Sequence, residues 1–268
     1  QEGLEFLKSL ESNSVDLVLT DPPYIISHET GMDKWMDHVD EVDDIGNDIK
    51  TEADWEQYLT DNENKKLQSS SKQNYLKYGS IYGKKYAVRT DYGEWDSGFT
   101  LEGMNQFIKE FYRVLKPGGT CIVFFDIWKV TPLKEQLEAS KFKQLRFIEW
   151  IKTNPQPLNS SVNYLTNCRE IALLGIKKSK PTFNSKYNKA VYEYPIQGGK
   201  ERWHPTQKSL PLFEELIEIH SNEGDVVLDP FLGAGTTAVA AKRTGRNFVG
   251  CELDEETYKK AKKWADNV

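Results

Sequence analysis

Short apolar strands that alternate with helical segments constrain the fold of this chain more than any other sequence feature. One such strand is Val15–Thr20, and another lies at residues 120–125. Between them, residues 103–115 have the apolar spacing of an amphipathic helix, which the sequence Lys-Pro-Gly-Gly at 116–119 ends. Buried strands in alternation with helices of this size predict a doubly wound α/β sheet.

The same pattern continues beyond this first unit. It places further helices at residues 4–10, 52–59, 131–139, 209–220, 236–243 and 255–264 and further strands at residues 142–152, 170–177, 225–228 and 247–251. We expect the strands at 142–152 and 170–177 to form an antiparallel pair. Residues 28–98 are polar and acidic, and we interpret them as an insertion in a single domain that spans 1–268. The insertion is either a mobile lid or partner-binding arm, or a solvated excursion without a direct role.

Composition excludes several classes of protein. The 268 residues, 38% of them hydrophobic, suffice for one large domain with a core. No stretch approaches the roughly 18 apolar residues of a membrane span. The first residues lack the basic segment and apolar core of an export signal, and the three cysteines lie far apart. We therefore expect a cytoplasmic protein with no membrane span, no disulfide scaffold and no metal site.

The net charge of −6 conceals two regions of opposite sign. Residues 21–60 contain 12 Asp and Glu against 2 Lys and Arg, whereas residues 141–208 contain 13 Lys and Arg against 4 Asp and Glu. The basic region also contains Trp, Tyr, Phe, Asn and Gln, a mixture typical of phosphate contact and base recognition. A solvated basic face is the alternative interpretation.

A glycine-rich turn follows the predicted strand at 225–228. Its sequence, Asp-Pro-Phe-Leu-Gly-Ala-Gly-Thr-Thr at 229–237, leads directly into a predicted helix. Glycines allow a ligand to approach the backbone closely, and the start of a helix offers free N–H groups. Glu252, 23 residues after Asp229, ends the next predicted strand, where a carboxylate can accept both hydroxyls of a ribose. This set predicts a nucleoside-containing cofactor. By spacing alone a dinucleotide also fits, and Glu252 alone fits a helix-capping role.

The sequence Asp21-Pro22-Pro23-Tyr24 directly follows the strand Val15–Thr20. Two consecutive prolines keep the backbone stiff and extended, so the Asp21 side chain and the Pro22 carbonyl form two acceptors fixed close together. Two such acceptors suit an NH2 group, and Tyr24 supplies a flat face on which a ring can stack. The pattern predicts a site for a planar amine. The alternative is a strand-ending turn with a capping Asp.

A third motif, His-Pro-Thr-Gln-Lys at 204–208, precedes the predicted helix at 209–220. Pro and Thr can start a helix, and Lys208 is long enough to reach a carboxylate or a phosphate. In isolation, plain helix capping is the better explanation of this segment.

Together these motifs resemble the β class of amino-group DNA methyltransferases, which use S-adenosylmethionine. The matching segments are DPPY at 21–24, LKPGG at 115–119, IEWIKTNP at 148–155, HPTQK at 204–208 and LDPFLGAGTT at 228–237. The catalytic motif precedes the cofactor motif and a target-recognition region lies between them, which is the order of this class. The chain departs from the family in two places. Glu2-Gly3 stands where relatives often have Gly-Asp, and the loop after DPPY is usually much shorter.

The resemblance implies a Rossmann-like class I methyltransferase fold, circularly permuted, with a seven-stranded, mostly parallel sheet, one antiparallel strand and an inserted recognition region. The permutation would place the next edge strand before Gln1, so we expect a short or missing strand at that edge. The implied reaction is methyl transfer to the N6 of adenine in double-stranded DNA, after the base is flipped out of the duplex. The implied catalytic residues are Asp21, Pro22, Pro23 and Tyr24, and the implied cofactor residues are Asp229, Pro230, Phe231, Gly233, Gly235, Thr236, Thr237, Glu252, His204, Thr206 and Lys208.

Residues 155–202 are the expected target-recognition region. The candidate contacts to bases or phosphates are Asn159, Asn163, Asn167, Arg169, Lys186 and Arg202. Among relatives DPPY usually accompanies adenine, but the correlation is imperfect, so methylation of cytosine N4 remains an alternative. A non-catalytic DNA-binding subunit of a methyltransferase is another. A homodimer and a cognate restriction endonuclease in a restriction-modification system are compatible partners.

Overall fold

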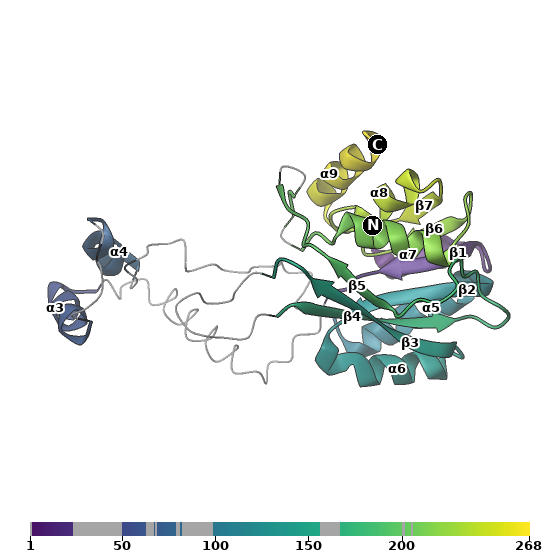
Figure 1. Ribbon diagram of the computed structural model, residues 1–268, viewed down its shortest axis with the longest axis horizontal. Coiled ribbons are helices and arrows are strands. Elements are labelled where there is room, and N and C mark those ends of the chain that lie inside the picture. Colours follow the sequence, from purple (N-terminus) through teal and green to yellow (C-terminus); the bar gives the residue numbers. More distant parts are fainter. Residues whose placement is uncertain are drawn as a thin grey trace. The chain divides into compact units, whose positions relative to one another are not determined.

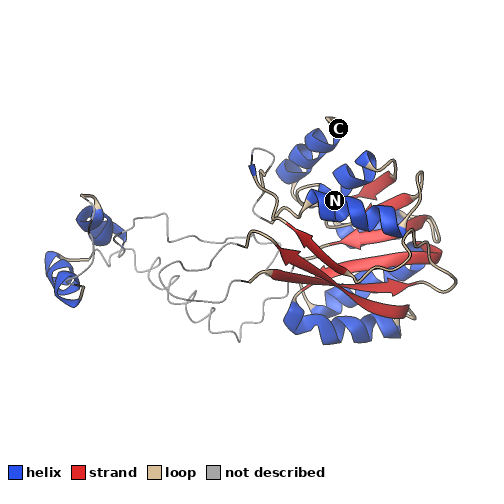
Figure 2. Cartoon of the chain, viewed as in Figure 1, coloured by secondary structure: helices blue, strands red, loops and turns tan. Residues whose placement is uncertain are grey.

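The computed structural model describes residues 2–23, 50–62, 67, 69–78, 81, 99–155, 167–199, 202–204 and 206–268. The chain divides into two compact units, one of Gln1–Ile25 with Asp96–Val268 and one of Ile26–Trp95. In the larger unit, helices cover both faces of a single sheet (Figure 1, Figure 2).

Seven strands form this sheet in the order β5-β3-β4-β2-β1-β6-β7. They are β1 (Val15–Thr20), β2 (Leu115–Phe125), β3 (Lys143–Lys152), β4 (Arg169–Ile176), β5 (Val191–Tyr194), β6 (Val226–Asp229) and β7 (Asn247–Gly250). Strand β4 is antiparallel to both β2 and β3, whereas the other neighbouring pairs are parallel. This arrangement confirms the predicted mostly parallel sheet with one antiparallel strand, including the expected antiparallel pair β3 and β4.

The sheet is buried on both faces because its central strands are apolar on both sides. Helices α1 (Gly3–Ser9), α5 (Leu101–Val114) and α6 (Val130–Ala139) cover one face, and a short 3₁₀ helix, η2 (Ile127–Lys129), precedes α6. Helices α7 (Leu210–His220) and α8 (Thr236–Arg243) cover the other face, and α9 (Glu255–Asp266) packs against α8. Successive residues of β2 alternate between the two cores, and Phe124 stacks on Phe213 of α7 with ring centroids 5.5 Å apart.

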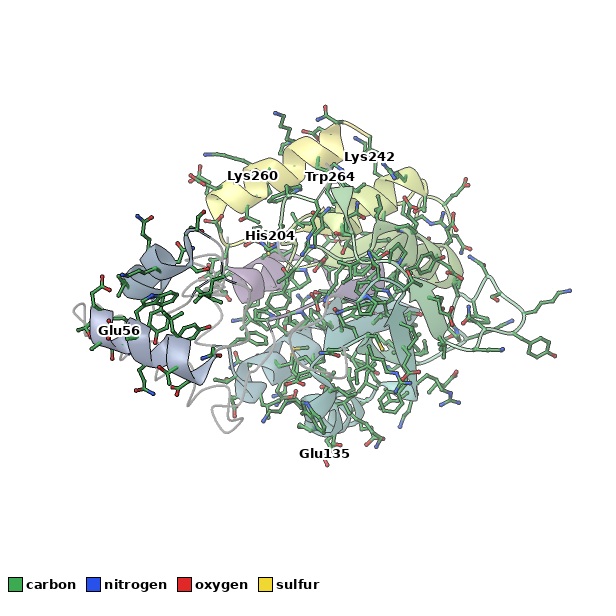
Figure 3. All side chains as sticks on the ribbon, turned by 60° about the vertical axis from the view of Figure 1, so that its left-hand side comes forward. Glu56, Glu135, His204, Lys242, Lys260 and Trp264 are labelled. Carbon is green, nitrogen blue, oxygen red and sulfur yellow. The ribbon has the colours of Figure 1, made fainter. Side chains whose placement is uncertain are left out.

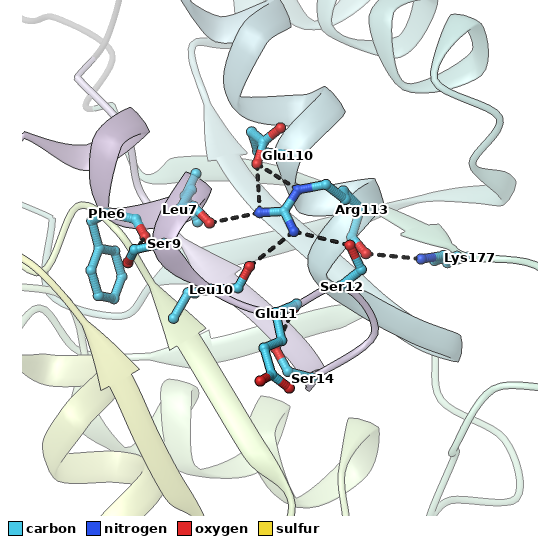
Figure 4. Close-up of polar contacts among 10 residues, drawn as sticks. All are labelled: Phe6, Leu7, Ser9, Leu10, Glu11, Ser12, Ser14, Glu110, Arg113 and Lys177. Carbon is cyan, nitrogen blue, oxygen red and sulfur yellow. Dashed lines mark hydrogen bonds and ion pairs between the residues drawn. The ribbon is translucent and has the colours of Figure 1, made fainter.

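Arg113, near the end of α5, fixes α1 to that helix. Its guanidinium donates to the backbone carbonyls of Leu7 at 2.7 Å and Leu10 at 2.9 Å, and to Ser12 Oγ at 3.0 Å (Figure 4). Lys177 Nζ in turn donates to the carbonyl of Arg113 at 3.2 Å. These donors add to the backbone hydrogen bonds that the Leu7 and Arg113 carbonyls accept at the ends of the two helices. Because α1 leads into β1, they also fix where β1 enters the sheet.

The smaller unit contains α3 (Glu52–Asp61) and α4 (Ser71–Tyr78). A capping box between Thr51 and Asp54 starts α3. Trp55, Tyr58 and Tyr75 form an aromatic cluster between the two helices, with ring centroids 4.6 to 5.6 Å apart. The helix predicted at 52–59 is confirmed. The sequence did not predict α4, because its polar residues show no helical spacing of apolar positions.

The remaining predicted elements agree with the structure apart from two differences in the sheet. Strand β2 begins at Leu115 rather than at 120, directly after α5, and its register with β1 shifts between Val15 and Leu17. Strand β5 was not predicted, because four residues in a basic, tyrosine-rich segment give no strand signal until they pair with β3. Strand β7, four residues long, is the outer strand on the side of the sheet opposite β5. Within the described part of the chain, no helix is long and apolar enough to span a membrane.

Candidate active site

The carboxyl ends of β1 and β6 place two aspartates at the same edge of the sheet, the edge at which the parallel strands end. The two strands are parallel neighbours in which Val18 pairs with Leu228. Asp21 follows β1 directly, and Asp229 is the last residue of β6. The chain continues from β1 to β2 on one side and from β6 to β7 on the other, so the strand order reverses here. Open α/β sheets bind their ligands at such a point.

Asp229 ties β1, β6 and α8 together. Thr20 Oγ1 donates to its Oδ1 at 2.7 Å, and Thr237 Oγ1 donates to its Oδ2 at 2.6 Å. The N–H of Phe231 adds a third hydrogen bond at 3.0 Å. Burial raises the pKa of Asp229 to about 6 and outweighs these hydrogen bonds, which lower it, while the nearby charge of Asp21 raises it further. The carboxyl group thus holds the start of the glycine-rich turn against β1.

The raised pKa of Asp229 predicts that its contribution to stability depends on pH. The pKa is 3.8 in an ordinary environment and about 6 in the folded protein, so the folded state binds more protons between these values. Its contribution is therefore fully present below pH 3.8 and is lost as the pH rises through about 6. We expect the free energy of unfolding of the wild type relative to Asp229→Asn to fall by up to about 3 kcal/mol across this interval. Urea denaturation at a series of pH values measures it. A difference that stays flat or rises with pH would contradict the prediction.

Lys208, directly before α7, lies between two carboxylates at this edge. Its Nζ contacts Asp21 Oδ2 at 2.9 Å and Glu170 Oε2 at 2.6 Å. Lys152, at the end of β3, contacts the other oxygen of Glu170, Oε1, at 2.6 Å. Antiparallel β4 brings Glu170 to this edge, because Glu170 pairs with Trp150 near the end of β3. Four charges of alternating sign therefore lie in a row from β1 to β3.

These charges are largely withdrawn from solvent. The side chains of Lys208, Lys152 and Glu170 are 11%, 15% and 16% exposed, and that of Asp21 is 22% exposed. Burial alone would raise the pKa of Glu170, but the attraction of Lys208 and then of Lys152 outweighs it and holds the pKa well below its ordinary value of 4.5. Sequence reasoning missed Glu170 and Lys152. The available signal was that both are charged residues at the ends of strands expected to pair.

The glycine-rich turn and Glu252 lie together, as the sequence predicts. The N–H of Gly233 donates to Glu252 Oε2 at 2.8 Å, and Glu252 Oε1 accepts from the N–H groups of Leu253 and Asp254 at 2.8 and 3.0 Å. Gly235, with φ of 87°, is the N-cap of α8. A carboxylate next to the backbone N–H groups of a helix start is an arrangement suited to a nucleoside-containing ligand.

Two buried polar atoms near this turn lack hydrogen-bond partners among the described residues. Thr236 Oγ1 lies in the first turn of α8, and Trp203 Nε1 lies next to the segment 204–208. Trp203 and Phe248 both pack against the small apolar cluster of Leu232. Buried donors and acceptors in proteins are nearly always satisfied, so these atoms indicate where a polar ligand fits.

The segment 204–208 lies within electrostatic reach of the turn. Burial lowers the pKa of His204, while Glu252 raises it and Lys260 of α9 lowers it (Figure 3). Thr206 Oγ1 lies 3.0 Å from His204 Nδ1 and is exposed. The structure therefore brings His204 to the side of Glu252, whereas Lys208 contacts Asp21.

Phe231 and Pro230 complete the turn from the other side. Phe231 packs against Phe107 and Phe99, with ring centroids 4.5 and 5.5 Å apart. The carbonyl of Pro230 accepts a hydrogen bond from Cys251 Sγ at 3.4 Å. The first contact anchors the turn to the core beneath α1 and α5, and the second ties it to the end of β7. No cluster of His, Cys, Asp or Glu suited to a metal ion occurs among the described residues.

The predicted DNA contacts fall in different places. Asn167 and Arg169 lie at the start of β4, at the same edge as Asp21, and Arg169 Nε is 3.9 Å from Glu149 Oε1. Lys186 lies in the connection from β4 to β5, which begins at the edge where the parallel strands start. Asn184, two residues earlier, donates its N–H to the carbonyl of Ile219 near the end of α7. The structure thus does not bring Lys186 to the other candidates. Tyr24, Asn159 and Asn163 lie outside the described residues, and Arg202 lies in a short described stretch before Trp203.

Sequence comparison identifies a family and its members. Residues 15–263 match a family described as DNA methylase. The chain is 36% identical over 195 residues to Type II methyltransferase M2.DpnII of Streptococcus pneumoniae, an alignment that covers 66% of this chain and 72% of that protein. It is 27% identical over 287 residues to Type II methyltransferase M.HpaI of Haemophilus parainfluenzae, covering 99% of this chain and 72% of that protein.

Solved structures give the same fold. The M1.HpyAVI-SAM complex superposes with a TM-score of 0.62 at 25% identity, covering 100% of this chain and 97% of that one. The cytosine-N4-specific PvuII DNA methyltransferase superposes with a TM-score of 0.63, covering 98% of this chain and 83% of that one. At 16% identity the second likeness concerns the fold alone.

Proposed function

This chain belongs to the N6/N4 DNA methylase family, and from that premise we propose that it methylates the N6 of adenine within a specific sequence of double-stranded DNA. Methyl transfer from S-adenosylmethionine to DNA is the activity of the family, and the choice of adenine is the proposal. One observation carries the methylation of an amino group. The Asp21 carboxylate, an acceptor suited to an amine, lies at the switch point close to Asp229, the first residue of the glycine-rich turn.

The residues around the turn fit S-adenosylmethionine. Thr236 Oγ1 and Trp203 Nε1 are buried polar atoms without partners among the described residues, which is what a polar ligand at this place would satisfy. Glu252 would hold the ribose hydroxyls, and Gly233 and Gly235 would let the cofactor approach the backbone. When bound, the cofactor supplies a methyl group that its sulfonium has already activated.

The residues at the end of β1 act on the target amine. An aromatic amine is a poor nucleophile, because its lone pair is conjugated with the ring. Asp21 and the carbonyl of Pro22 would accept hydrogen bonds from the two N–H groups of the amine. These bonds favour a pyramidal nitrogen, which frees the lone pair for in-line attack on the methyl group. Asp21 Oδ2 already accepts from an ammonium group at 2.9 Å, so the carboxylate can serve N–H donors here. Tyr24 would stack on the base once it is flipped out of the duplex.

The identity of the base rests on the motif rather than on the fold. Asp-Pro-Pro-Tyr usually accompanies adenine in the family that this sequence resembles. The PvuII DNA methyltransferase, which is cytosine-N4-specific, has the same fold. Cytosine N4 is therefore the second candidate, with the same chemistry at Asp21.

Several finer assignments belong to the same proposal. Residues 155–202 would form the recognition region, in which Asn167 and Arg169 are supported by their position at the edge that carries Asp21. The Type II names of the relatives support a cognate restriction endonuclease as a partner of this chain. We place the action of this chain on DNA in the cytoplasm. A homodimer remains part of the proposal.

Incubation with labelled S-adenosylmethionine and unmethylated genomic DNA tests the proposed base. We expect N6-methyladenine on mass analysis of the nucleosides, and sequencing of the same DNA should place it in one recognition sequence. N4-methylcytosine would preserve the mechanism and overturn the base. Label on neither base, from protein that binds the cofactor, would contradict the proposed function.

A further inference from the structure

The Asp21 carboxylate is contacted by a side chain from outside its own motif. Pro22 and Pro23 restrict the backbone that follows Asp21, but they do not restrict the torsions of the Asp21 side chain. The Lys208 ammonium contacts Oδ2 of this side chain at 2.9 Å. A lysine, however, is a point charge on a flexible four-carbon stem, so it orients a partner only when it is itself held.

Glu170 holds Lys208. The two side chains contact each other at 2.6 Å, and the Glu170 side chain is 16% exposed. Glu170 belongs to β4, which is paired on both sides, with β2 and β3. Lys152 contacts its second oxygen at 2.6 Å, so each carboxylate oxygen of Glu170 is paired with one ammonium group. Strand β4 thus holds Glu170 in place, and Glu170 in turn holds Lys208.

The row of charges is electrically neutral when Asp21 is counted with it. Two carboxylates and two ammonium groups compensate each other, which limits the cost of their burial. Without Asp21, the other three members would carry one uncompensated positive charge. These members are Glu170, Lys152 and Lys208. The row ends on the carboxylate to which the proposed mechanism assigns the target amine.

We propose that Glu170 is a positioning residue for methyl transfer, which holds Lys208 so that Lys208 orients the carboxylate of Asp21. This inference rests on the proposed function, because it gives Asp21 the role of amine acceptor. It does not depend on which base is methylated, since the assay below counts methyl groups on either one.

Glu170→Gln removes the charge but keeps the size of the side chain. We expect it to lower kcat for DNA methylation about 10- to 100-fold and to leave the Kd for S-adenosylmethionine within about twofold. Lys208→Met should lower kcat as well and leave the Kd for S-adenosylmethionine within about twofold, because Asp21 loses the contact at 2.9 Å that orients its carboxylate. Glu135→Gln, an exposed glutamate on α6 outside the proposed recognition region, is the matched control and should leave kcat unchanged.

The double variant distinguishes positioning from a general loss of stability. Because Glu170 is proposed to act through Lys208, adding Glu170→Gln to Lys208→Met should cause no further loss of kcat. Independent losses that multiply, or an unchanged kcat in folded Glu170→Gln, would overturn the inference. If Glu170→Gln alone does not fold, Lys152→Met removes the cation left behind, and the same cycle is measured in that background.

Urea unfolding keeps this test separate from the proposed function. Asp21→Asn and Glu170→Gln should be non-additive in their effect on unfolding when Lys208 is present and additive when it is replaced by Met. Additivity in both backgrounds would overturn the row of contacts itself. A wild-type protein that methylates neither base, but shows the coupling through Lys208, would contradict the proposed function and not these contacts.

Discussion

Asp21→Ala is expected to lower methyl transfer to DNA by about 10²- to 10⁴-fold and to leave cofactor affinity within about twofold. The loss follows from the proposed mechanism, in which this carboxylate accepts a hydrogen of the target amine. Cofactor affinity should persist because Gly233, Glu252, Leu253 and Asp254 are held together by hydrogen bonds of their own. The variant should fold, because Lys208 keeps its contact with Glu170 at 2.6 Å.

Single-turnover methylation and equilibrium binding of S-adenosylmethionine measure the two quantities separately. Asp16→Asn is a suitable control because Asp16 lies on the same strand but at its opposite end, where it pairs with Lys116 at 2.8 Å and accepts the N–H of Val226 at 2.9 Å. It should transfer methyl groups at the wild-type rate. Methyl transfer that survives in Asp21→Ala would remove Asp21 from the mechanism, and an equal loss in Asp16→Asn would attribute the effect to β1 as a whole.

The sequence predicts this edge of the sheet well because its motifs are local. Asp21 follows an apolar strand, and the glycine-rich turn follows another, so the position of each needs only its own neighbours in the chain. That the two strands are adjacent was not predicted from the sequence and is shown by the pairing of β1 with β6. Glu252 reaches the turn as predicted, through its contact with the N–H of Gly233.

Contacts that depend on register could not be predicted in this way. Glu170 and Lys152 meet only because β3 and β4 pair with Trp150 opposite Glu170, and periodicity fixes the existence of such strands but not their alignment. Lys208 was assigned to the cofactor by resemblance, whereas its contacts here are Asp21 and Glu170. A long side chain can reach several partners from one place in the sequence.

The sequence also could not separate the two edges of the sheet. The basic region at residues 141–208 includes the connection between β4 and β5 (Figure 1). This connection begins at the end of β4, which lies at the edge of the sheet opposite the one that carries Asp21. Ile176, at the end of β4, pairs with Thr120 at the start of the apolar part of β2. Net charge along a chain therefore combines residues such as Arg169 and Lys186 that the antiparallel direction of β4 separates.

Gly235→Ala is expected to lower the free energy of unfolding by about 2 to 4 kcal/mol and to weaken the binding of S-adenosylmethionine more than about tenfold. Gly235 has φ of 87°, and an added Cβ would lie 2.9 Å from the Cβ of Ala261 and 3.3 Å from its Cα. Ala261 is buried in α9, so relief of the clash requires the backbone of α9 or of the turn to move. Such a movement shifts the N–H groups at the start of α8, where the cofactor is proposed to bind.

Gly224→Ala separates backbone strain from the clash at Gly235. Gly224 has a similar φ of 81°, but an added Cβ would meet nothing within 4 Å. It should therefore cost only the left-handed conformation, about 1 to 2 kcal/mol, and leave cofactor binding unchanged. Urea denaturation and titration with S-adenosylmethionine give both quantities for each variant. If the two variants lose the same stability and both keep full affinity, then the contact between the turn and α9 does not shape the cofactor site, and the role proposed for Gly235 is wrong.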